Sequence, residues 1–180
     1  AAVLDRVRAM FLPAADLAVD RLLPMGASVD EVVIVEPAYD AYEPAVRLNG
    51  GRAVFVPMTF PGYRMDWKQV RQAVSNRTRL LILNSPHNPT GSVVSKADFE
   101  AFLRQVPDGV VTVVDEAYIE FVRSPECLRG VDFLNARCPV VTLRTFSKAY
   151  GLAGLRIGYG ILPAEIAGIL NRVRQPFNVN

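Results

Sequence analysis

The residues of greatest chemical interest lie around Lys148, in the segment 145–156. This lysine follows an apolar run and precedes small residues and glycines, which predicts partial shielding from water. Burial disfavours the charged ammonium and makes a lysine a usable amine nucleophile. The hydroxyls of Thr145 and Ser147, the loop amides and the guanidinium of Arg156 are together suited to binding one phosphate group. Taken alone, the segment also fits a surface lysine in a glycine-rich loop.

Three other sets of polar residues follow apolar runs in the same way. Glu36 and Tyr39 follow the first run, residues 84–88 follow the third, and Asp115 and Tyr118 follow the fourth. Parallel α/β sheets place their ligand sites at the carboxyl ends of the strands. We therefore expect these residues and the lysine to meet at one edge of a sheet. Polar residues also begin simply where strands end, which explains any one set but the whole group less well.

The apolar runs predict the strands of that sheet. They are short, rich in β-branched residues and apolar on both faces, as strands covered by helices on both sides are. The runs are Val32–Val35, Ala53–Val56, Leu80–Leu83, Val110–Val114, Val140–Leu143 and Ile157–Ile161. If the last run is antiparallel to its neighbour, Arg156 lies at the same sheet edge as the other polar sets.

Helix signals separate these runs. Capping patterns at Asp66 and Ser95 precede two helix candidates. A third candidate, residues 43–48, ends at an Asn-Gly-Gly stop, and a fourth opens at Pro163. Alternating strands and helices predict a three-layer α/β/α domain with a mostly parallel sheet and one antiparallel strand.

The two ends of the chain predict that it is a piece of a larger subunit. Residues 1–8 look like the inside of a helix, and residues 175–180 stop in a loop. We expect residues 1–180 to form one incomplete domain.

Composition excludes several classes of protein. Of the 180 residues, 51% are hydrophobic and 21% charged, with a formal net charge of +2 and no basic run, which argues for a globular domain and against a nucleic-acid partner. His87 is the only histidine, so a histidine-based metal site is excluded, and Cys127 and Cys138 form no C-x-x-C pair. No apolar run approaches the ~20 residues needed to span a bilayer. The expected location is the cytoplasm.

Four segments together resemble a known family. Residues 145–160 resemble the cofactor-lysine signature of class I and II aminotransferases of fold type I. Residues 84–91, NSPHNPTG, are similar to the family's N-x-x-N-P-T-G segment, and residues 114–118, VDEAY, to its D-E-x-Y segment. Residues 36–42, EPAYDAY, resemble its E-P-x-Y-x-x-Y element. The four motifs occur in family order and cover nearly the whole chain.

The resemblance implies pyridoxal 5'-phosphate as cofactor, with Lys148, Asp115 and Tyr118 as catalytic residues. Lys148 would hold the cofactor covalently and then carry the proton between the substrate's α-carbon and the cofactor's aldehyde carbon. Asp115 would pair with the pyridine nitrogen and keep it protonated. Asn88 and Tyr118 would hydrogen-bond the phenolic oxygen, and Tyr39 would stack on the ring. Taken alone, Asp115 also fits the N-cap of a helix, Asn88 also fits a turn, and Tyr39 also fits an ordinary core or edge aromatic residue.

One part of the expected phosphate site departs from the family pattern. The family uses a small-residue turn at the start of its first helix, and the nearest match here, residues 13–17, lacks the glycine. The backbone amides of Ala14 and Ala15 remain candidates for phosphate contacts, together with Thr145, Ser147 and Arg156.

The resemblance also bears on domains and partners. It implies an N-terminal arm and a C-terminal small domain that this chain lacks, a carboxylate-binding arginine in that small domain, and a homodimer in the full-length protein. The substrates would be an amino acid or amine phosphate together with 2-oxoglutarate.

The choice of substrate stays open at this point. Residues 143–160 and 171–180 are similar to histidinol-phosphate aminotransferases of histidine biosynthesis, whereas residues 39–102 are closer to methionine- or kynurenine-type 2-oxo-acid aminotransferases. We favour histidinol phosphate because that match is longer and adjoins the lysine. The same motifs also fit a cofactor-binding regulator or inactive domain, and a β-lyase or decarboxylase. Arg144 and His87 are given no role.

Overall fold

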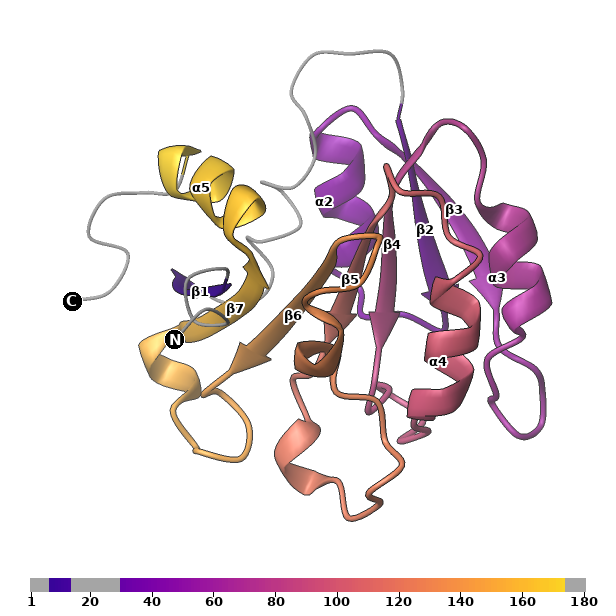
Figure 1. Ribbon diagram of the computed structural model, residues 1–180. Coiled ribbons are helices and arrows are strands. Elements are labelled where there is room, and N and C mark those ends of the chain that lie inside the picture. The colour runs from indigo at the N-terminus through magenta and orange to yellow at the C-terminus, as the bar shows by residue number, and fades with distance from the viewer. Residues whose placement is uncertain (1–6, 14–29, 174–180) are drawn as a thin grey trace.

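The computed structural model describes residues 7–13 and 30–173, and in these residues seven strands form one sheet. The strands lie in the order β1-β7-β6-β5-β4-β2-β3 (Figure 1). Their bounds are β1 Val7–Pro13, β2 Glu31–Glu36, β3 Arg52–Pro57, β4 Thr78–Asn84, β5 Val111–Asp115, β6 Val140–Thr145 and β7 Ile157–Pro163. The pairs among β2 to β6 are parallel, and β7 is antiparallel to both of its neighbours.

Within residues 30–173, four α-helices pack on the two faces of this sheet. They are α2 Tyr42–Leu48, α3 Trp67–Ala73, α4 Lys96–Leu103 and α5 Ala164–Val173. Short 3₁₀ turns lie at Ile119–Phe121, Gly130–Phe133 and Ala153–Leu155. Buried residues of α2 and α5 share one hydrophobic cluster, and those of α3 and α4 share the other. The domain therefore has the three layers that the sequence predicts.

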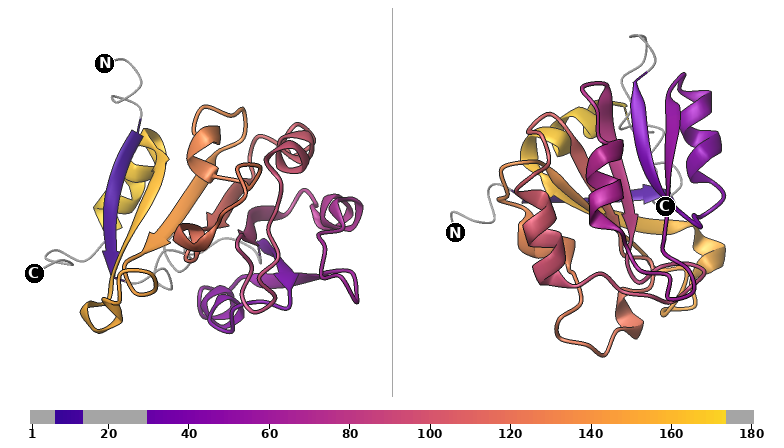
Figure 2. Two further views of the ribbon diagram at one scale, coloured as in Figure 1. Left: turned by 90° about the horizontal axis from the view of Figure 1, so that it is seen from below. Right: turned by 90° about the vertical axis from the view of Figure 1, so that its right-hand side faces the viewer.

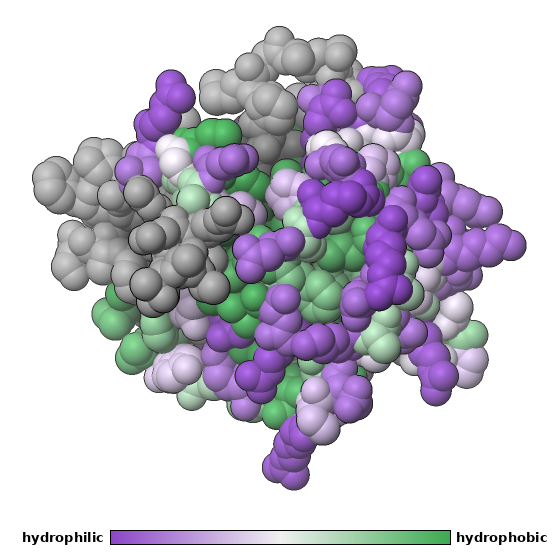
Figure 3. Space-filling view, viewed as in Figure 1, coloured by the Kyte–Doolittle hydropathy of each residue, from purple (hydrophilic) through white to green (hydrophobic). Residues whose placement is uncertain are grey.

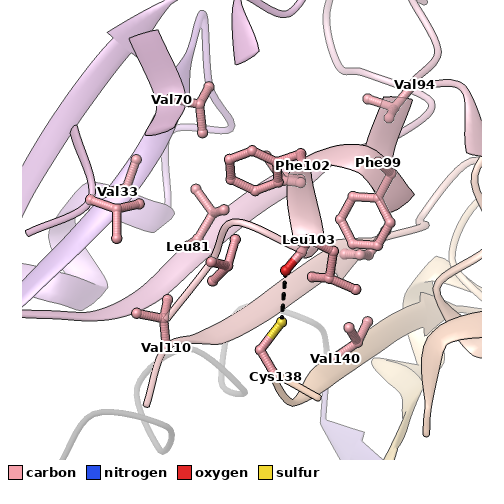
Figure 4. Packing of buried hydrophobic residues seen from close by; sticks show 14 of the residues in the cluster. Val33, Val70, Leu81, Val94, Phe99, Phe102, Leu103, Val110, Cys138 and Val140 are labelled. Carbon is pink, nitrogen blue, oxygen red and sulfur yellow. Dashed lines mark hydrogen bonds between the residues drawn. The ribbon is translucent and has the colours of Figure 1, made fainter. Parts of the chain in front are cut away.

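Alternate strand residues fill these two clusters. Val32 and Ile34 of β2 join the cluster under α2 and α5, while Val33 of the same strand joins the one under α3 and α4. Figure 4 shows this second cluster, in which Phe99 packs beside Phe102 and the Cys138 thiol donates to the Leu103 carbonyl oxygen at 3.6 Å. Apolar burial on both faces is what makes these strands read as continuous hydrophobic runs.

All six strands expected from the apolar runs are present, within two residues of their predicted ends at either side. The predicted helix starts are confirmed in detail. The Asp66 carboxylate accepts hydrogen bonds from the amides of Lys68 and Gln69, and the Ser95 hydroxyl accepts one from the amide of Asp98. Such caps satisfy backbone donors that a helix leaves unpaired at its start.

The prediction of a helix at the beginning of the chain is wrong for its last residues. Val7 and Arg8 belong to β1, which pairs with β7 along its whole length, from Val7 opposite Pro163 to Pro13 opposite Ile157. The two strands run side by side at one end of the sheet (Figure 2). This partner lies about 150 positions away in the sequence, so a local pattern gave no sign of the pairing.

The surface on the side seen in Figure 1 has hydrophobic residues across its middle and hydrophilic residues around them (Figure 3). None of the helices within residues 30–173 combines the length and the apolar character that crossing a bilayer requires.

Candidate functional site

The carboxyl ends of the parallel strands bring the predicted site residues to one cavity of about 180 Å³. Every described candidate lines it. The full lining is Tyr39, Tyr42, Asn84, Asn88, Asp115, Ala117, Tyr118, Thr145, Ser147, Lys148, Ala153 and Arg156. Ala14 and Ala15, the remaining phosphate candidates, lie outside the described residues. Each of the four polar sets therefore contributes to this sheet edge, although Glu36, the last residue of β2, does not line the cavity.

Asp115 is the buried acid of this cavity, at the last position of β5 and only 5% exposed. Its Oδ1 accepts a hydrogen bond from the Ala117 amide at 3.0 Å, and the Tyr42 hydroxyl donates to its Oδ2. No α-helix starts here, because the next element is the 3₁₀ turn that follows Tyr118. The structure therefore does not support the interpretation of Asp115 as a helix N-cap.

Lys148 lies in the loop after β6, with its Nζ 5.2 Å from the centre of the Tyr118 ring. An ammonium near an aromatic face is attracted to the ring by about 0.5–1 kcal/mol at exposed sites. The predicted shielding of this lysine from water is wrong for the described residues, since Lys148 is exposed. The loop runs over the edge of the sheet, and the described residues leave its outer side open to solvent.

The hydroxyl of Thr145 shapes the turn that leads to the lysine. It accepts from the Ser147 amide at 3.1 Å and donates to the Ile157 carbonyl oxygen at 3.4 Å. Because β7 is antiparallel to β6, with Thr145 opposite Gly158, Arg156 returns to the same sheet edge as expected. A side chain at Gly158 would meet the Arg144 carbonyl oxygen at 2.8 Å, so this close strand pairing requires glycine.

Asn84 connects two strands at the floor of the cavity. Its Nδ2 donates to the Asp115 carbonyl oxygen at 2.9 Å, and its Oδ1 accepts from the Asn88 amide at 2.6 Å. One side chain thus ties the acid-bearing strand to the loop that carries Asn88. Neither this residue nor Tyr42 received a role from the sequence, although both stand in the quoted motifs.

Two signals in the sequence were available for these residues. Tyr42 follows Tyr39 at a spacing of three, which places side chains on one side of a helical turn, and the two rings meet edge to face at 5.5 Å. Asn84 directly follows the apolar run 80–83, which places it at a strand end, and its position opposite Asp115 is seen only in the folded sheet.

His87 has a structural place next to the cavity. It is buried, and its Nδ1 lies 2.8 Å from the Thr90 hydroxyl oxygen. Burial lowers the pKa of His87, and a hydrogen bond to the backbone of Pro37 opposes that effect. The ring therefore connects the loop bearing Asn88 with the loop after β2.

Arg144 forms a buried ion pair with Glu116. Its Nε and one terminal nitrogen each lie 2.8 Å from Oε2 of Glu116, while Oε1 accepts from the Gly130 amide at 2.5 Å. Burial raises the pKa of Glu116, and the Gly130 amide and the arginine act in the opposite direction. The pair joins the ends of β5 and β6, the two strands that lead to Asp115 and Lys148.

The donor set fits pyridoxal phosphate. A buried carboxylate suits a protonated pyridine nitrogen, a lysine amine suits an aldehyde, and a phenol with an amide suits a phenolate oxygen. Arg156, Ser147 and the loop amides suit a phosphate group. All of these groups border a single cavity.

Comparison with known proteins agrees with this interpretation. The family model for aminotransferase class I and II matches residues 4–180. Among curated proteins, histidinol-phosphate aminotransferase of Moorella thermoacetica is 46% identical over 152 residues, which cover 84% of this chain and 39% of that protein. An aromatic amino acid aminotransferase of Streptomyces coelicolor is 45% identical over 151 residues, covering 84% of this chain and 42% of that protein.

Solved structures show the same fold. A protein of Escherichia coli described as having a methionine aminotransferase function superposes with a TM-score of 0.81 at 31% identity, over 92% of this chain and 44% of that one. Histidinol-phosphate aminotransferase of Clostridium acetobutylicum has a TM-score of 0.84 at 22% identity, over 97% of this chain and 51% of that one, which speaks for the fold alone. The chain spans about two fifths of the length of the curated relatives it matches. With its site residues gathered at the sheet edge and its sequence matched from residue 4 onward, the chain belongs to the class I and II aminotransferase family, whose members use pyridoxal phosphate.

Proposed function

We propose that this chain binds pyridoxal phosphate covalently through Lys148 and serves transamination between an amino donor and a 2-oxo acid. The observation that carries this proposal is the single cavity lined by Lys148, Asp115, Asn88 and Tyr118. When bound, the cofactor supplies an electron sink that stabilises a carbanion at the substrate's α-carbon. The cofactor supplies that sink, whereas the side chains of the protein bind the cofactor, orient it and move protons.

Each side chain has a definite task in this proposal. The Lys148 amine holds the cofactor and then moves a proton at the substrate's α-carbon. Asp115 keeps a proton on the ring nitrogen, while Asn88 and Tyr118 bind the phenolic oxygen. Tyr39 packs against the ring, and the phosphate is held by Thr145, Ser147 and Arg156, together with the Ala14 and Ala15 amides.

Borohydride labelling tests the cofactor attachment. The chain mixed with pyridoxal phosphate is expected to show a yellow absorption band, and reduction is expected to fix the cofactor to Lys148 in peptide mapping. Lys148→Ala abolishes the label, whereas Lys96→Ala retains it, because Lys96 pairs with Asp132 on the surface. A label on another lysine, or none, contradicts the proposal.

Asp115→Asn tests the acid. The variant keeps two polar side-chain atoms and the fold, but it lacks the charge that holds a proton on the ring nitrogen. Transfer of the amino group from donor to cofactor is expected to slow strongly in single-turnover absorption measurements. Equal transfer rates in the wild type and the variant contradict this role.

For the substrate, we propose histidinol phosphate with 2-oxoglutarate as the amino acceptor, in histidine biosynthesis. The likeness of residues 143–160 to that enzyme class and the 46% identical Moorella relative support it. The second candidate is an aromatic amino acid or methionine, which the 45% identical Streptomyces relative and the Escherichia coli structure favour.

Spectra of the bound cofactor discriminate between these substrates. Histidinol phosphate, phenylalanine, methionine and kynurenine are each added to the loaded protein, and conversion of the cofactor to its amine form is followed. Fast conversion by histidinol phosphate supports the first candidate, and preference for phenylalanine or methionine supports the second. A cofactor-binding regulator or inactive domain converts none.

We further propose that residues 1–180 form the cofactor-binding large domain of a homodimeric subunit as long as its relatives. The relatives' length, of which this chain spans about two fifths, supports a further domain. Sedimentation of a subunit of that full length tests the dimer, and a monomer at micromolar concentration contradicts it.

A further inference from the structure

The phenol of Tyr42 meets the acid of the cavity from a distant part of the sequence. Tyr42 begins α2 and Asp115 ends β5, and the residues are 73 positions apart. Tyr42 is 4% exposed, its hydroxyl donates to Oδ2 of Asp115, and both residues line the cavity. The contact is therefore a product of the tertiary fold, made by a residue that stands in the quoted E-P-x-Y-x-x-Y element but received no role from it.

Asp115 is held at its backbone as well as at its carboxylate. The Ser85 amide and the Asn84 side-chain amide donate to its carbonyl oxygen at 3.0 and 2.9 Å. At the carboxylate, the Ala117 amide occupies Oδ1 and the Tyr42 hydroxyl occupies Oδ2. A donor on each oxygen restricts rotation of the carboxylate, whose residue lines the cavity.

A hydrogen bond to a carboxylate stabilises its charged form, and it does so more strongly in a buried place than in water. If the ring nitrogen of the cofactor is to keep its proton, the carboxylate facing it must remain the weaker base of the two. We propose that Tyr42 is a positioning residue, which orients the Asp115 carboxylate and keeps it charged toward the ring nitrogen of pyridoxal phosphate. This inference rests on the proposed function.

The ring of Tyr42 also packs in the hydrophobic cluster under α2 and against Tyr39. A test must therefore separate the hydroxyl from the ring. Tyr42→Phe removes only the hydroxyl and keeps the packing. Replacement of Tyr42 by a fluorinated tyrosine keeps the hydroxyl and the ring packing, and it makes the hydroxyl a stronger hydrogen-bond donor. The two changes alter the hydrogen bond in opposite directions.

The readout is the ¹⁵N resonance of pyridoxal phosphate labelled at its ring nitrogen and bound to the chain. In Tyr42→Phe the carboxylate is a stronger base and takes more of the shared proton, so the resonance moves toward that of unprotonated pyridine. The fluorinated residue moves it the other way. The dissociation constant for pyridoxal phosphate rises about tenfold in Tyr42→Phe, because a carboxylate that is no longer held in place must be ordered when the cofactor binds.

Two controls separate positioning from packing. Tyr150→Phe removes a hydroxyl from the exposed part of the lysine loop, outside the cavity lining, and leaves both readouts unchanged. In an Asp115→Asn background, Tyr42→Phe has little further effect on the dissociation constant, because the carboxylate charge through which it acts is gone. If Tyr42 is purely structural, Tyr42→Phe weakens cofactor binding equally in the wild-type and Asp115→Asn backgrounds, and that result overturns the inference.

The remaining outcomes are also decisive. If the wild-type chain binds the cofactor and Tyr42→Phe has the same dissociation constant and the same ¹⁵N resonance, the role of Tyr42 is overturned. The proposed function is then left intact. A wild-type chain without affinity for pyridoxal phosphate overturns both.

Discussion

Arg156 combines a strained backbone with a side chain that faces the cavity. Its φ of +52° lies in the left-handed region, which costs a non-glycine residue about 1–2 kcal/mol. Strain of this kind often accompanies function. Arg156→Gly removes the strain and the guanidinium together, so we expect the free energy of unfolding to stay equal or rise slightly, while the affinity for pyridoxal phosphate falls at least tenfold.

Arg156→Ala provides the matched comparison for that prediction. It removes the same guanidinium but retains the backbone strain, so it weakens cofactor binding equally and is less stable than the glycine variant in urea unfolding. Equal affinity of the glycine variant and the wild type would show that the arginine contributes nothing to the phosphate site.

Single residues also show the limits of the sequence. Lys148, Asp115 and Asn88 were found because family-like motifs contain them, and they do line one cavity. The contacts of Tyr42 with Asp115 and of Arg144 with Glu116 join positions 73 and 28 apart, and only the folded sheet brings such residues together. The exposure of Lys148 was mispredicted for a related reason, because shielding depends on what packs over a loop.

At the scale of elements, the Arg144–Glu116 pair fastens β5 to β6. The Glu116 side chain is fully buried and that of Arg144 is 18% exposed. Removing one partner of a buried pair leaves an uncompensated charge, which typically costs about 3–5 kcal/mol. Arg144→Met is therefore expected to lower the free energy of unfolding by that amount at neutral pH, measured by urea titration. Arg104→Met, which breaks the exposed pair with Glu100, should cost at most about 1 kcal/mol.

The same pair predicts a pH dependence with a definite sign. The pKa of Glu116 is raised in the folded protein, so its contribution to stability is present below the unfolded pKa and is lost as the pH rises through the folded value. Loss of the arginine raises that pKa further. The stability gap between wild type and Arg144→Met should therefore be smallest near pH 4 and widen toward neutrality. A gap independent of pH contradicts the ionisation of Glu116.

The elements themselves were largely predictable. Strands buried on both faces leave continuous β-branched runs, and helix caps leave Asp or Ser at their start, so local patterns located both kinds of element. The exception was β1, whose only pairing in the described residues is with β7, far along the chain. Strand order and the antiparallel sense of β7 likewise depend on pairings that no local window contains.

At the scale of the whole molecule, the two hydrophobic clusters support the sheet from opposite sides. Phe99 is fully buried in the cluster under α3 and α4, edge to face with Phe133 at 4.9 Å between ring centres. Phe99→Ala should lower the free energy of unfolding by about 3–5 kcal/mol in denaturant titration. Phe60→Ala, at a position 80% exposed, should change it by less than about 0.5 kcal/mol.

The antiparallel sense of β7 has a consequence for how the protein assembles. Thr145, Ser147 and Arg156 come from one continuous stretch that closes on itself through the pairing of Thr145 with Gly158. Asp115 and Asn88 reach the cavity only after parallel strands from distant parts of the chain have aligned. Contacts between near neighbours form faster than those that close long loops. The half of the cavity suited to an anion can therefore exist early in folding, before the half that carries Asp115 and Asn88.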